Sequence, residues 1–154
     1  MIIQLRQKAP DERERNRPAA ALRYGATWVT GAARTADARR AVHAFLAHAI
    51  RTAHTHITKR AEQDAQLVVS ELVTNALRHA PGPCGLLLEL STDNTRLGIT
   101  VWDTSPSLPR MHERDGTRVG GHGLYLVQAC SRALTATARP GGKQITAEVA
   151  LASA

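Results

Sequence analysis

The stretch that decides the fold reads ELVTNALRHA at residues 71–80. With the residues before it, it predicts a helix, because its apolar side chains recur at helical spacing. These are Leu67, Val68, Leu72, Val73, Ala76 and Ala80. Glu71 and Asn75 are four residues apart, so a carboxylate and a carboxamide share one face of the helix, one turn apart. The Pro-Gly-Pro sequence at 81–83 then ends the helix.

This pair of side chains indicates a class of chemistry only in combination with the downstream sequence. A carboxylate for proton transfer beside an oxygen ligand for a hard cation is the minimum needed for Mg-nucleotide chemistry. Taken alone, the pair fits a solvated polar face better than a functional site. Downstream, an apolar strand pattern ends at Asp103, a long loop comes next, and Gly121-His122-Gly123-Leu124 opens a further helical pattern. Three polar features in this order favour the nucleotide interpretation.

Composition bounds the class of protein. The chain has 154 residues, of which 43% are hydrophobic and only 3% aromatic, so we expect one domain with an aliphatic core. No apolar run approaches the roughly 18 residues that a membrane span needs, and the N-terminus lacks the apolar core of a signal peptide. We therefore expect no membrane association and a cytoplasmic location. Cys84 and Cys130 fit no metal or redox spacing, so we expect reduced, packed thiols.

The net charge of +7 raises the question of nucleic acid. Its excess is mostly scattered arginine, and two Trp, two Tyr and one Phe leave little for base stacking. We therefore do not expect nucleic-acid binding; a basic surface can equally meet an acidic protein or a nucleotide. The seven histidines form no His-Glu-x-x-His motif, and His54 and His56 fall in an expected loop. We expect no metal site there.

The remaining patterns predict the element order. Residues 1–20 are charged and polar and are expected to form a flexible arm before a domain at 21–154. We expect strands at 22–30, 85–90, 97–102, 134–139 and 144–151, and helices at 35–53, 58–80 and 122–133. Thr35 or Asp37 is the expected cap of the first helix. The result is an α/β two-layer sandwich, with a mixed, mainly antiparallel sheet of about five strands packed on three helices.

These residues resemble the GHKL (histidine-kinase-like, or Bergerat) ATP-binding family, and within it the small anti-sigma-factor serine/threonine kinases of actinobacteria. Residues 70–80 match the family's N box, and residues 121–127 match its second glycine box. The resemblance implies ATP and Mg²⁺ as cofactors. It implies that Glu71 is the general base and that Asn75 ligates Mg²⁺. Whether His79 lies at the phosphates or only compensates the helix dipole stays open.

The resemblance also assigns the base and phosphate contacts. Asp103 would accept a hydrogen bond from the adenine amino group, although an Asp before Thr-Ser-Pro also suits a simple turn. The backbone of Gly121 and Gly123 would approach the phosphates. The lid, at about 104–122, and the start of its following helix supply further candidate contacts: Arg114, Arg118, His122 and Leu124. For Lys143, in a Gly-Gly-Lys turn, we expect only an ordinary hairpin tip.

Two departures from the family pattern bear on function. The first glycine box, Asp-x-Gly-x-Gly in the family, reads Asp-Thr-Ser-Pro-Ser at 103–107, and the Trp-Gly pair common in relatives is missing from the last hairpin. The resemblance implies a kinase acting on an anti-anti-sigma (STAS-domain) partner. The departures keep open a nucleotide-binding module that sequesters a sigma factor or another regulator. The partner's identity is open, and relatives are often homodimers.

Overall fold

The computed structural model describes residues 19–29, 34–79, 82–105 and 122–152. Within them lie five strands, β1 (Ala20–Trp28), β2 (Cys84–Ser91), β3 (Arg96–Asp103), β4 (Ala133–Arg139) and β5 (Gly142–Ala150). The helices are α2 (Thr35–Ala53), α3 (Lys59–His79) and α4 (His122–Cys130). The expected elements are therefore all present, with bounds shifted by a few residues.

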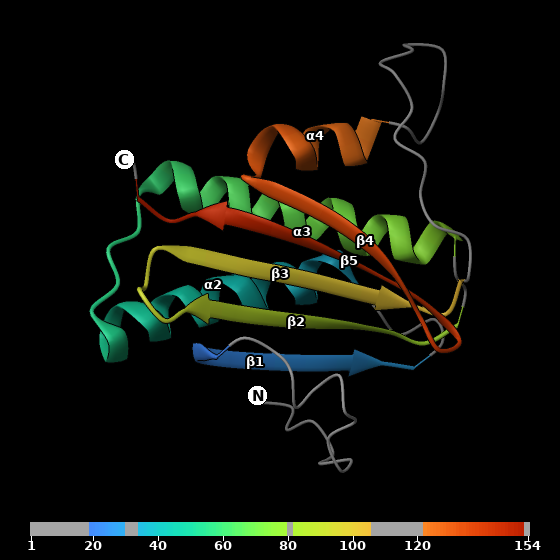
Figure 1. Cartoon of the computed structure of the whole chain (residues 1–154), viewed down its shortest axis with the longest axis horizontal. Helices are drawn as coiled ribbons and strands as arrows, with labels where there is room; N and C mark the ends of the chain where they lie inside the picture. The colour runs from blue at the N-terminus through green and yellow to red at the C-terminus, as the bar shows by residue number, and fades with distance from the viewer. Residues whose placement is uncertain (1–18, 30–33, 80–81, 106–121, 153–154) are drawn as a thin grey trace.

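The strands form one sheet in the order β1-β2-β3-β5-β4, and every pairing in it is antiparallel. Figure 1 shows α2 and α3 packed on one face of this sheet, with α4 lying against α3 beside β4. This is the predicted two-layer α/β sandwich. The sheet has one helix-covered face because alternate residues of β2, β3 and β5 are apolar and buried.

The core lies between the sheet and the two long helices. It takes Val68, Leu72 and Val73 from α3 and Leu88, Ile99 and Ala147 from the strands, all at most 1% exposed. Helix α3 buries the apolar stripe that its sequence predicts, so its other faces are left for polar groups. Cys84 is buried and Cys130 partly buried, and both thiols are free, as expected.

Two local expectations are wrong. Arg34, not Thr35 or Asp37, is the N-cap of α2, and its side chain makes no capping hydrogen bond. Asp37 instead lies in the first turn, where it pairs with Arg40. Helix α4 ends at Cys130, three residues earlier than expected, because Arg132 N–H already donates to Glu148 O of β5 at 2.7 Å.

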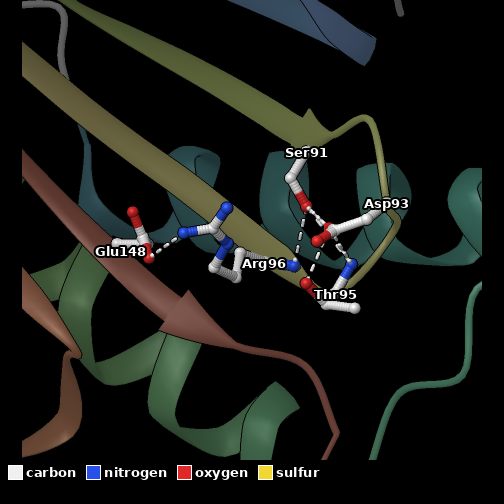
Figure 2. A network of polar contacts seen from close by, with 5 residues as sticks. All are labelled: Ser91, Asp93, Thr95, Arg96 and Glu148. Atoms are coloured by element: carbon white, nitrogen blue, oxygen red, sulfur yellow. Dashed lines mark hydrogen bonds and ion pairs between the residues drawn. The ribbon is translucent and has the colours of Figure 1, made fainter.

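The β2–β3 turn is closed by its own side chains. The Asp93 carboxylate accepts from the hydroxyls of Ser91 and Thr95, both at 2.6 Å, and from Thr95 N–H at 3.0 Å, as Figure 2 shows. Asn94 occupies the left-handed region with φ 61°, which asparagine tolerates in turns. These bonds fix the register in which β2 and β3 begin their pairing.

None of the helices in the described part of the chain is long and apolar enough to cross a membrane.

Candidate active site

The C-terminal half of α3 carries the first two candidate residues. Glu71 and Asn75 are both half-buried and lie one turn apart, about 6 Å along the helix axis at 1.5 Å per residue. Their neighbours Leu72, Val73 and Ala76 are buried in the core. The core therefore anchors this part of the helix, and the two polar side chains leave it on another side.

The start of α4 lies directly against Glu71. A Cβ built on Gly123, the second residue of α4, would stand 2.5 Å from Glu71 Oε2. Only a glycine permits this approach, so Glu71 and Gly123, which belong to motifs far apart in the sequence, lie side by side. The first-turn amides of a helix have no partner within the helix, and their partial positive charge favours an anion. The Glu71 carboxylate, the candidate base, therefore lies beside a candidate phosphate-binding helix end.

Asn75 is the candidate metal ligand, which would bind a cation through its side-chain oxygen. Its Nδ2 is buried and, among the described residues, has no hydrogen-bond partner. A buried amide nitrogen is normally bonded, so this side chain is not held in place by the fold through that atom. The described residues hold no group of three or more His, Cys, Asp or Glu that could cage a metal. Mg²⁺ does not need one, since it commonly keeps waters and binds one or two protein oxygens together with phosphates.

Asp103, the last residue of β3, is the candidate base contact. It is only 4% exposed. Its Oδ1 accepts Ser105 N–H at 2.9 Å, which is the Asx turn that the Asp-Thr-Ser sequence also allows. The turn role of Asp103 is therefore present in the structure.

The expectation for Lys143 in the last hairpin is wrong. This residue is not an exposed hairpin tip but the second residue of β5, opposite Asp103 and only 2% exposed. Its Nζ lies 3.0 Å from Asp103 Oδ2 and 3.1 Å from Oδ1. Lys143 precedes Ile145, Ala147 and Val149 at a spacing of two residues, and these three are buried. This spacing could have placed Lys143 on the core face of the strand.

Two glycines bring the surrounding segments close to Asp103. A Cβ on Gly142 would overlap Asp103 O, and one on Gly82 would overlap Thr104 Oγ1. The chain after α3 and the β4–β5 hairpin thus both meet the end of β3. Figure 1 shows the ends of α3 and β3, the start of α4 and this hairpin on the same side of the molecule, at the right of the view.

Cys84 adds a thiol to this corner. Burial, and to a smaller extent the negative charge of Asp103, raises the pKa of the Cys84 thiol. The thiol is therefore held in its neutral form beside the Asp103–Lys143 pair. Sequence reasoning treated Cys84 only as a packed residue and missed its place next to Asp103.

Most of the remaining candidate residues lie wholly or partly outside the described part of the chain. Arg114, Arg118 and Gly121 lie outside the described residues. His79 ends α3 and His122 begins α4, but their side chains are also outside the described part. Leu124 is half-buried and packs against the core, so any ligand contact it makes is through its backbone or its exposed part.

Comparison with known proteins gives a family. The family described as "Histidine kinase-like ATPase domain" matches residues 31–149, which include both sequence motifs and Asp103. No curated protein sequence matches the chain.

Two solved structures match the chain. One holds the RsbU and RsbW domains of Rv1364c from Mycobacterium tuberculosis, with a TM-score of 0.62 and 16% identity over 87% of this chain and 34% of that one. This chain thus spans about a third of the length of that solved chain. The other is the histidine kinase domain of a blue-light-activated kinase from Erythrobacter litoralis, with a TM-score of 0.47 and 22% identity, over 79% of this chain and 66% of that one.

Proposed function

The chain belongs to the histidine kinase-like ATPase domain family, and from this we propose that it is an ATP-binding regulator of the anti-sigma-factor type. In this proposal it is a Mg-ATP-dependent serine/threonine kinase whose substrate is an anti-anti-sigma (STAS-domain) partner. The observation that carries the proposal is the contact between Glu71 and Gly123, with the amide of Asn75 one turn away on the same helix. A base, a metal ligand and a phosphate-binding helix end then share one site.

Each residue has a defined task in this proposal. Asp103 accepts a hydrogen bond from the adenine amino group, and the α4 amides near Gly123 hold phosphate oxygens. Asn75 supplies a side-chain oxygen to Mg²⁺, which when bound neutralises charge on the phosphates. Glu71 accepts the proton of a serine or threonine hydroxyl of the partner. The hydroxyl oxygen then bonds to the γ-phosphorus, the bond from that phosphorus to the bridging oxygen breaks, and ADP leaves.

The likeness to a structure containing an RsbW domain is consistent with this type of regulator, but at 16% identity it supports the fold alone. A kinase and a binding module could both use this fold to hold a nucleotide. The choice between them therefore depends on the residues of the site.

A second function is favoured by one observation. Asp103 is bonded by Ser105 N–H and Lys143, and the sequence after it lacks the glycines of the family's first box. Without those glycines the backbone beside the base contact is stiffer, which suits a module that binds nucleotide without turnover and acts by sequestering a sigma factor or another regulator.

Phosphoryl transfer from [γ-³²P]ATP to a panel of recombinant STAS-domain proteins separates the two functions. If the chain is a kinase, wild type labels a partner, and Glu71→Gln binds ATP but does not label it. ATP binding with no labelled partner, together with a stable complex with a sigma factor, would favour the sequestering module. Labelling retained in Glu71→Gln would exclude Glu71 as the base.

A further inference from the structure

The Asp103–Lys143 pair is the most buried ionic contact in the described part of the chain, with side-chain exposures of 3% and 2%. The other ion pairs there have at least one partner that is 40% exposed or more. Burying two charges is costly, and exchanging such a pair for apolar residues is often neutral or stabilising. Stability alone is therefore a weak reason for this pair.

The position of the pair points to a role in binding. On β3 and β5, alternate residues face the core. Val101 pairs with Ile145, and the next core-facing pair along the two strands is Asp103 with Lys143. Apolar residues could have continued this alternation to the sheet end. The polar pair instead stands at the strand end that carries the candidate base contact.

The hydrogen bonds leave one oxygen of Asp103 less occupied than the other. Oδ1 receives Ser105 N–H at 2.9 Å and Lys143 Nζ at 3.1 Å, whereas Oδ2 has, among the described residues, only its ion-pair contact with Nζ at 3.0 Å. A carboxylate oxygen can accept about two hydrogen bonds. Oδ2 therefore keeps one acceptor position, in an orientation that Lys143 and Ser105 fix from two sides.

We propose that Lys143 is a positioning residue for base selection. It holds the Asp103 carboxylate with Oδ2 directed to take one N–H donor, so that the site selects a purine with an exocyclic 6-amino group. This inference rests on the proposed function, because it assigns the base end of the same nucleotide site. Gly142 supports the arrangement, since its contact with Asp103 O lets the hairpin bring Lys143 to the carboxylate.

The test compares the affinities of Mg-ATP and of the Mg complex of purine riboside triphosphate, which lacks the 6-amino group, by calorimetry. Wild type is expected to prefer ATP by roughly 10- to 100-fold, as for a hydrogen bond to a charged group. Lys143→Met is expected to bring this preference below about 3-fold and to change the affinity for the analogue much less. A purely structural lysine would change both affinities together.

A second variant tests the same role in case Lys143→Met, which leaves the buried Asp103 carboxylate without its partner, does not fold. Asp103→Leu/Lys143→Met exchanges the pair for apolar side chains and is expected to unfold at the same or higher urea concentration than wild type. It should bind ATP and the analogue equally. Lys59→Met, which changes an exposed lysine at the start of α3, should keep the wild-type preference.

The outcomes distinguish this inference from the proposed function. An undiminished preference for ATP in Lys143→Met or in the double variant overturns the positioning role and leaves the nucleotide site standing. Failure of wild type to bind either nucleotide overturns the proposed function and the inference with it.

Discussion

At the scale of single residues, the contact between Gly123 and Glu71 makes the sharpest prediction. In Gly123→Ala the new Cβ would stand 2.5 Å from Glu71 Oε2. The neighbour is the free end of a flexible side chain, so the carboxylate moves and the fold is kept. Alanine also favours a helix over glycine by about 1 kcal/mol. We expect unchanged or slightly raised stability, and a loss of phosphoryl transfer of about 100-fold from the displaced base.

Single-turnover transfer and urea unfolding measure the two effects separately. Gly98→Ala is the matched control, because its Cβ would meet nothing closer than Glu89 O at 3.7 Å. Wild-type transfer by Gly123→Ala would mean that the position of Glu71 against α4 does not matter for the reaction.

The residue scale also shows what sequence could and could not predict. The four-residue spacing of Glu71 and Asn75 is a property of any helix, so it could be predicted from the helical pattern alone. The Asp103–Lys143 pair depends on the register of β3 against β5, 40 residues apart in the chain. A Pro-Gly-Gly sequence before Lys143 indicates a turn and hides the strand alternation that buries it.

At the scale of elements, α2 begins without a cap. Arg34 has extended φ and ψ of −132° and 136°, the usual N-cap geometry, but its side chain makes no capping hydrogen bond. We expect Arg34→Ser to raise the free energy of unfolding by about 1 kcal/mol, because the hydroxyl can accept a first-turn N–H. Urea unfolding measures this change in the free energy of unfolding. Arg39→Ser, inside the same helix, should instead lower it by about 0.3 kcal/mol; equal effects of the two changes would rule out capping.

The β2–β3 turn predicts a pH dependence (Figure 2). Hydrogen bonds from the side chain of Ser91, then the side chain and the backbone of Thr95, lower the pKa of Asp93 from 3.8 to about 2. Because the folded pKa is the lower one, the contribution of Asp93 is fully present above about pH 4. It is lost as the pH falls through about 2.

The change Asp93→Asn tests this. Thermal midpoints of wild type should fall between pH 4 and pH 2, and the variant should lose less over the same interval because its amide does not titrate there. Parallel pH profiles for the two proteins would show that Asp93 does not contribute to acid sensitivity.

At the scale of the whole molecule, sequence predicted the layers but not the strand order. Alternation in the strands and a 3.6-residue period in the helices give a two-layer sandwich, since each element needs one covered face. The insertion of β5 between β3 and β4 is a nonlocal pairing that no local pattern encodes. This order is what carries Lys143 to Asp103. The fold was thus more predictable than the base end of the site.

From the net charge of the chain we predict non-specific binding to polyanions only. The +7 charge permits weak binding to any polyanion, which should weaken steeply with salt. We expect fluorescence anisotropy to detect no sequence preference among duplex DNA probes and little binding at 0.2 M salt. Tight, sequence-dependent binding under those conditions would make nucleic acid a specific partner.

The nucleotide site is tested most simply by a calorimetric titration of ATP, with and without Mg²⁺, into wild type and Asn75→Ala. Asn75 suits this test because its buried Nδ2 makes no hydrogen bond within the described residues, so removing the amide should not harm the fold. We predict Mg²⁺-dependent binding in wild type, and in Asn75→Ala a loss of about 5- to 150-fold that removes most of the Mg²⁺ dependence. Absence of binding by wild type at millimolar ATP, or an unchanged Mg²⁺ dependence in the variant, would contradict it.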